Sequence, residues 1–162
     1  MWSQRSTIDY ALARRSTLQS LLTGSVTTTD VCDADPYLLR AAKFHGEATT
    51  RRCPVCRKVN LTHVTYVFGD ELGQYSGRIK ATVELEPMAH EHGEFRVYVV
   101  EVCQGCAWNH LHVSYVLGDG EPRTRGRASA HRSAATAATA ATSTSATSAT
   151  VPARRRSRAA EE

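Results

Sequence analysis

Four of the five cysteines form two pairs with the same spacing. Each pair has the pattern Cys-x-x-Cys, and 46 residues separate the two pairs. A turn of this kind presents two thiolates to one metal ion and directs backbone N–H groups at the sulfurs, so two such turns complete a tetrahedral site for zinc. Iron fits the same four-sulfur geometry. We therefore predict a structural zinc site formed by Cys53, Cys56, Cys103 and Cys106.

The ligand set of this predicted site argues against an enzyme. A catalytic zinc needs an open coordination position and usually has His or carboxylate ligands, whereas four thiolates close the site. The sequence also contains no nucleophile elbow and no phosphate-binding loop. We expect neither a catalytic activity nor a small-molecule substrate. A thiol redox sensor is a weaker alternative, because both cysteine pairs adjoin predicted strands rather than a strand-to-helix junction.

Each cysteine pair is followed by the same short motif. Residues 63–70 read His-Val-Thr-Tyr-Val-Phe-Gly-Asp and residues 112–119 read His-Val-Ser-Tyr-Val-Leu-Gly-Asp, with six of eight positions identical. Each repeated unit is therefore a metal-binding turn that leads into a strand. We expect His63 and His112 to be structural, either in equivalent positions of a strand pair or close to the metal ligands.

The region between the cysteine pairs has the periodicity of strands. The three β-rich segments are Val59–Phe68, Glu94–Val102 and His110–Leu117. The second segment is apolar on both faces, which is typical of a central strand. The insertion at residues 69–93 is too long to be wholly irregular, so we expect a strand at Arg78–Val83 and a short helix at Leu85–His92 within it.

The order of turn, strand, insertion, strand, turn and strand from Cys53 to Gly118 resembles the zinc-ribbon superfamily, which recurs in transcription and translation proteins. The residues before the tail also resemble a family of small uncharacterised proteins from high-GC bacteria. That second resemblance rests on residues 37–42, 93–103 and 108–111. The resemblances imply the ribbon fold and the zinc, and they leave the activity open.

The first fifty residues read as helical. Ser6 or Thr7 is the predicted N-cap of a first helix that ends before Gly24. A second helix is predicted to start at Thr29 or Asp30. Asp35-Pro36 is typical of a third helix start, and that helix is expected to end at Gly46. Short helices that pack on a sheet explain this pattern better than a DNA-binding helix-turn-helix. Cys32, between the helices, is expected to be a buried thiol and not a ligand.

The composition changes at Arg123. Residues 1–122 carry 12 Lys and Arg against 14 Asp and Glu, whereas residues 123–162 carry 8 against 2 and are rich in Ala, Thr and Ser. Such a segment cannot bury enough apolar surface to fold, so we expect a disordered basic tail. The predicted fold class is α+β, with short N-terminal helices (1–50) packed on a three-stranded antiparallel zinc ribbon (51–122). No apolar run is long enough to cross a membrane and no secretory signal is recognisable, which predicts a cytoplasmic protein.

Two groups of cations stand out as candidate contacts for nucleic acid. The group around the first cysteine pair has two alternative roles, which are to offset the negative charge of a four-thiolate zinc site or to contact phosphate. Trp108 either supplies a base-stacking platform or caps the core. We expect a nucleic acid, or a component of RNA polymerase or the ribosome, as the partner, and a protein-protein scaffold as the alternative. The candidate residues are Arg51, Arg52, Arg57 and Lys58 in the body and Arg154, Arg155, Arg156 and Arg158 in the tail.

Overall fold

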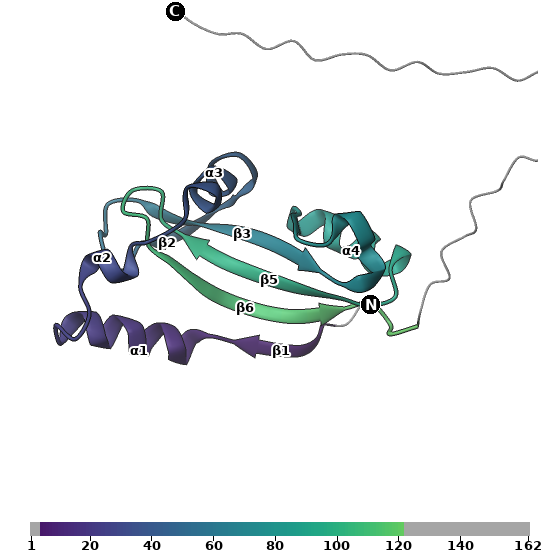
Figure 1. Cartoon of the computed structure of the whole chain (residues 1–162), viewed down its shortest axis with the longest axis horizontal. Coiled ribbons are helices and arrows are strands. Elements are labelled where there is room, and N and C mark those ends of the chain that lie inside the picture. The colour runs from purple at the N-terminus through teal and green to yellow at the C-terminus, as the bar shows by residue number, and fades with distance from the viewer. Residues whose placement is uncertain (1–3, 122–162) are drawn as a thin grey trace, which may run out of the picture. The chain divides into compact units, whose positions relative to one another are not determined.

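The structure is a computed structural model, and it describes residues 4–121 of the chain. Within these residues the chain is α+β, as predicted, with helices on both sides of an antiparallel sheet (Figure 1). The elements are β1 (Arg5–Asp9), α1 (Ala11–Leu22), α2 (Thr28–Val31), α3 (Pro36–His45), β2 (Glu47–Arg52), β3 (Asn60–Phe68), the 3-10 helix η1 (Asp70–Tyr75), β4 (Arg78–Ile79), α4 (Thr82–Glu91), β5 (Phe95–Val102) and β6 (Asn109–Leu117). The predicted tail at residues 123–162, with its four terminal arginines, lies outside the described residues.

The sheet has six strands within residues 4–121, so the prediction of three strands was too low. The strand order is β1-β6-β5-β3-β2, β4 pairs with β3, and every pairing is antiparallel. The three predicted strands correspond to β3, β5 and β6, which form the middle of the sheet. β5 is the central strand, as its apolar faces predicted. The cysteine turns therefore lie at one end of a larger sheet and not on an isolated ribbon.

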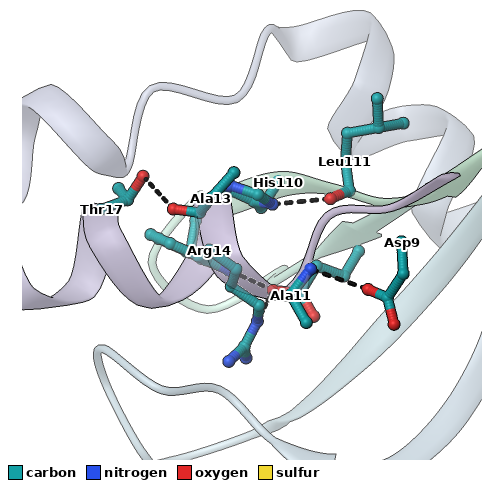
Figure 2. A network of polar contacts seen from close by, with 9 residues as sticks. Asp9, Ala11, Ala13, Arg14, Thr17, His110 and Leu111 are labelled. Carbon is teal, nitrogen blue, oxygen red and sulfur yellow. Dashed lines mark hydrogen bonds and ion pairs between the residues drawn. The ribbon is translucent and has the colours of Figure 1, made fainter.

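The N-terminal segment differs from its prediction. Residues 5–9 form β1 and pair with β6, with Ile8 opposite Ser114, so the prediction of a helix capped by Ser6 or Thr7 was wrong. The helix α1 instead starts at Ala11, where the Asp9 carboxylate accepts a hydrogen bond of 2.7 Å from the Ala11 amide (Figure 2). The edge of β6 accounts for the difference, because its backbone N–H and C=O groups form hydrogen bonds with residues 5–9 and hold them as a strand.

The third predicted helix is confirmed in its start and its end. The Asp35 carboxylate accepts a hydrogen bond of 2.7 Å from the Tyr37 amide, and Pro36 occupies the first turn. α3 ends at His45, immediately before Gly46. A Cβ atom at Gly46 would lie 2.5 Å from the Ala42 carbonyl oxygen, so this tight exit from the helix requires glycine.

The strand that follows α3 was not predicted. β2 has the sequence Glu-Ala-Thr-Thr-Arg-Arg, lacks apolar alternation, and is exposed along most of its length. Among the described residues it pairs with β3 alone, and it forms one edge of the sheet. Charged side chains at an edge discourage pairing with another chain. The exposed edge position explains why the sequence of β2 lacks the apolar alternation that predicts a strand.

The insertion between β3 and β5 is folded, as expected from its length. The predicted strand at Arg78–Val83 shrinks to the two residues of β4, and α4 begins at Thr82 instead of Leu85. The Glu84 carboxylate fixes this start, because it accepts a hydrogen bond of 2.8 Å from the Ala81 amide. α4 buries Leu85, Met88 and Ala89 in a core cluster that also includes Phe95 and Val97 of β5.

α1 and α3 lie on opposite faces of the sheet (Figure 1). Ala41 and Ala42 of α3 pack against Val64 and Val102. Side chains alternate between faces along a strand, so residue 101 points away from α3, and its side chain contacts Arg14 of α1. The short helices thus pack on the sheet, as expected. Among residues 4–121, no helix is both long and apolar enough to span a membrane.

Candidate metal centre

The two cysteine turns have the same backbone conformation. The first joins β2 to β3 and the second joins β5 to β6. The Arg57 amide donates to the Cys53 carbonyl over 3.1 Å, and the Ala107 amide donates to the Cys103 carbonyl over 2.9 Å. Arg57 and Ala107 also share a positive φ, 56° and 64°. The sequence repeat therefore includes the turns as well as the strands that follow them.

The turns bring the four predicted cysteine sulfurs together. Cys53 Sγ lies 3.6 Å from Cys106 Sγ, and Cys56 Sγ lies 3.6 Å from Cys103 Sγ. All four sulfurs lie within 4.8 Å of one another, and none forms a disulfide. Zinc–sulfur bonds of about 2.3 Å in a tetrahedron place the sulfurs about 3.8 Å apart. The four cysteines can hold one metal ion.

The protonation of these thiols shows why a cation suits the site. Hydrogen bonds from backbone amides, that of Lys58 first, lower the pKa of Cys56 to about 6. Burial raises the pKa of Cys103 and of Cys106 to about 12. Buried thiolates so close together repel one another, and a bound divalent cation supplies the opposite charge.

Apolar side chains enclose the cysteine cluster. Cys53 and Cys103 are buried in one core cluster with Leu61 and Trp108, and Leu18 of α1 packs against it. Trp108 is 0% exposed, so it caps the core and cannot stack on a base. Its indole Nε1 donates a hydrogen bond of 3.0 Å to Glu101 Oε1. The stacking platform considered for Trp108 is thereby excluded.

Cys32 lies beside the cluster, although it is not one of the four clustered ligands. Its Sγ is 3.6 Å from Cys106 Sγ, and its side chain is partly exposed. Burial raises the pKa of Cys32 and favours the thiol form, which can donate to a neighbouring thiolate. The Ala34 amide also donates a hydrogen bond of 2.9 Å to the Ala107 carbonyl, so the segment after α2 is tied to the second turn. Cys32 is therefore only partly buried, whereas the sequence predicted a buried thiol, and it stands outside the group of four clustered cysteines, as expected.

The four predicted cations of the body are exposed and close to the first cysteine turn. None of Arg51, Arg52, Arg57 and Lys58 forms an ion pair within residues 4–121. Arg52 and Arg57 line a cleft of about 540 Å³ beside Cys53. Arg51 lines an adjoining cleft of about 590 Å³. The predicted cations of the tail, Arg154, Arg155, Arg156 and Arg158, lie outside the described residues.

An exposed face of α3 carries aromatic and cationic side chains that the sequence analysis did not select. Tyr37 is 78% exposed and Phe44 is 67% exposed. The Arg40 guanidinium lies 5.8 Å from the Tyr37 ring centroid, and the Lys43 ammonium lies 5.5 Å from that of Phe44. Arg40 and Phe44 follow Tyr37 by three and seven residues, and this helical spacing in the sequence could have revealed the face. We call Tyr37, Arg40, Lys43 and Phe44 the α3 face.

The repeated histidines meet at a buried carboxylate, which the sequence analysis also missed. The rings of His63 and His112 are stacked with centroids 4.9 Å apart, and both histidines lie near Glu101. Glu101 is 0% exposed and its Oε1 accepts a hydrogen bond of 2.5 Å from Arg14 Nε. Burial lowers the pKa of His63, with a further contribution from His112. The two histidines do not occupy equivalent positions of the strand pair, because His63 lies opposite Glu101 whereas the residue of β6 opposite Glu101 is His110. The first of the two expectations for them was therefore wrong.

Comparison with known proteins gives a family without an assigned role. Residues 1–131 match the model of the "Family of unknown function (DUF5318)". "Uncharacterized protein Mb0050" of Mycobacterium bovis and "Uncharacterized protein Rv0049" of Mycobacterium tuberculosis (strain H37Rv) are each 51% identical to the chain over 122 residues, which is 75% of the chain and 89% of each relative. No solved structure matches the chain significantly. The chain belongs to the DUF5318 family.

Proposed function

We propose that the protein is a non-catalytic, zinc-stabilised domain that binds single-stranded nucleic acid. The observation that carries this proposal is the α3 face, where two exposed aromatic rings flank two cations along the helix. Proteins that bind single strands combine aromatic platforms for the bases with positive charge for the phosphates. The α3 face supplies the aromatic groups that are missing among the cations around the first cysteine turn.

Zinc suits the proposed role of the cysteine site. Four thiolates at tetrahedral spacing form a closed structural site, whereas catalytic zinc keeps an open position. The two turns come from segments far apart in the sequence, so a shared ion links the β2–β3 and β5–β6 connections. The resemblance of residues 53–118 to zinc ribbons supports the same metal. Zinc would thus hold the end of the sheet that carries Arg52 and Arg57.

The binding surface has two parts. The α3 face stacks bases, and the cations of the first turn, Arg51, Arg52, Arg57 and Lys58, contact phosphates. Three of these cations line clefts beside α1, on the other face of the sheet from α3, so a bound strand must pass around the cysteine turns. A groove of about 320 Å³ extends from Arg40 and Phe44 to Gln104 in the second cysteine turn, so the α3 face borders the metal centre. Single-stranded nucleic acid is exposed in complexes of RNA polymerase and of the ribosome. We propose a component of one of these machines as the partner.

Fluorescence anisotropy with a labelled single-stranded RNA and a matching duplex tests the proposal. The zinc-loaded full-length protein should prefer the single strand and bind less tightly as salt increases. Tyr37→Ala and Phe44→Ala should each weaken binding by about 1–3 kcal/mol, the contribution of one stacked base. Tyr75→Ala is the matched control, because this tyrosine is 43% exposed and also lies beside two cations, Arg78 and Lys80.

Two results would contradict nucleic-acid binding. One is a zinc-loaded chain ending at Pro122 that has no affinity for RNA or DNA at low salt. The other is an affinity that Tyr37→Ala and Phe44→Ala leave unchanged. A protein scaffold is then the better proposal, because Leu12 and Leu22 of α1 are 80% and 78% exposed. An apolar interface of that kind would survive nuclease treatment and high salt.

A further inference from the structure

We propose that His63, Glu101 and His112 form a second binding site for a divalent transition metal, separate from the cysteine site. The ligand atoms of these three residues lie within 4.8 Å of one another. The site shares no ligand with the four-cysteine cluster, and it lies on the face of the sheet that α1 covers. Nothing in the proposed nucleic-acid binding depends on it.

The first reason is that Glu101 has a buried oxygen with no partner. Oε1 accepts from both Arg14 Nε and Trp108 Nε1, at 2.5 and 3.0 Å. Oε2 is buried and makes no hydrogen bond within residues 4–121. A carboxylate oxygen left unsatisfied in a 0% exposed side chain costs free energy. A cation at Oε2 removes that cost.

The second reason is that His63 also has a buried polar atom, Nε2, without a hydrogen-bond partner in the described part of the chain. His63 pairs with Glu101 across β3 and β5, so the two side chains are neighbours on one face. An imidazole nitrogen and a carboxylate oxygen side by side, both unsatisfied, are the donor types that zinc and related ions accept.

The third reason is a local irregularity in β6 that brings in the second histidine. Val100 pairs with Leu111 and Val99 pairs with Val113, which leaves His112 as an extra residue in β6. Such a β-bulge redirects a side chain and is over-represented beside active sites. Its effect here is to place His112 beside the residues on the face of Glu101.

The ligand set indicates the class of metal and of site. Two histidines and one glutamate form a three-ligand zinc site that leaves a coordination position for water or an anion. His112 and Arg14 both line the cleft of about 590 Å³ beside α1, so an ion bound here borders that cleft. The site would therefore be of the open type, unlike the closed cysteine site.

Nearby cations do not prevent metal binding at this position. Arg14 and Trp108 hold Oε1, and such outer contacts orient a ligating carboxylate without occupying its second oxygen. Arg51 is exposed, so solvent and salt screen its charge. The carboxylate of Glu101 neutralises part of the charge of the ion, and an anion from the cleft can neutralise more.

Cobalt titration of the metal-free, full-length protein tests the proposal. The cysteine site should give the strong charge-transfer absorption of cobalt thiolate bonds. The His63 site should give a second equivalent with ligand-field bands and no thiolate band. His63→Gln and His112→Gln should each abolish the second equivalent and keep the thiolate band, which reports that the variant is folded. His110→Gln is the control, because this histidine of β6 stacks on Trp108 outside the proposed ligand set.

The wild-type titration decides the proposal even if a variant fails to fold. A protein that is saturated by one equivalent of cobalt, with no added ligand-field bands, would overturn it. A second equivalent that survives both histidine variants would also overturn it. Anomalous diffraction from crystals of the cobalt-loaded wild-type protein locates the ion directly. A peak beside His63 Nε2 and Glu101 Oε2 is expected, and a second peak elsewhere would refute the assignment.

Discussion

The rings of His63 and His112 are stacked, with centroids 4.9 Å apart and an angle of 30° between their planes. They occupy the first position of the two repeated segments, which form β3 and β6. β5 lies between these strands and is antiparallel to both. The repeat in the sequence does not give equivalent pairing, because Val64 lies opposite Val100 whereas Val113 lies opposite Val99. The irregularity of β6 at His112 is what brings the second histidine to Glu101 of β5.

Removing Arg14 should destabilise the fold strongly. Arg14→Leu leaves the buried Glu101 carboxylate without its charged partner, and breaking a buried pair in this way costs about 3–5 kcal/mol. Urea unfolding of the full-length protein measures the change. Arg15→Leu, the next residue and an exposed one, should change the free energy of unfolding by less than about 0.5 kcal/mol. Adding Glu101→Gln to Arg14→Leu should recover part of the lost free energy of unfolding. If Arg14→Leu and Arg15→Leu have equal effects, the Arg14–Glu101 ion pair does not stabilise the fold.

The cysteine site should hold one zinc ion on which folding depends. Cys53→Ser and Cys103→Ser should each lose that ion and unfold, because structural zinc contributes roughly 10–16 kcal/mol, as much as the whole stability of a small domain. Elemental analysis and circular dichroism measure the two effects. Cys32→Ser is the control and should keep the metal, because Cys32 does not belong to the group of four clustered cysteines. Folded wild-type protein without metal, or iron in its place, would contradict the assignment.

Residues after Pro122 should be dispensable for stability. The last strand of residues 4–121 ends at Leu117, and the Gly120 amide donates a hydrogen bond of 2.9 Å to the Gly93 carbonyl at that end of the sheet. A chain ending at Pro122 should therefore melt at the same temperature as the full-length protein. A decrease of several degrees, equivalent to about 1 kcal/mol, would mean that the tail packs on the body.

Gly118 should tolerate no side chain. Its φ is +96°, and an added Cβ would lie 2.1 Å from the Gly93 carbonyl oxygen. Gly24 is a matched control, because its φ is +76° but an added Cβ would meet nothing within 4 Å. Gly24→Ala should cost about 1–2 kcal/mol for the left-handed backbone alone, and Gly118→Ala should cost clearly more. Equal losses in thermal unfolding would show that the backbone around Gly93 moves aside.

Features that depend on local spacing were predictable from the sequence. The cysteine pairs, the three middle strands and the cap of α3 at Asp35 each have a signal within a few residues. β1 and β2 have no such signal, because edge strands are stabilised by the neighbour that they pair with rather than by their own apolar pattern. Glu101 could not be identified either, since its environment is formed by Arg14, 87 residues away, and by the bulge at His112.

The pairing of Arg5 with Val116 has a consequence for how the protein is made. A ribosome adds roughly 5–20 residues each second, so roughly 6–22 seconds separate the synthesis of these two residues. During that interval β1 has no partner, and the second cysteine turn, at Cys103, has only recently been made. The nascent chain therefore cannot complete its sheet or its metal site until nearly all of residues 1–121 have been translated. A chain interrupted before β6 lacks the strand with which β1 pairs.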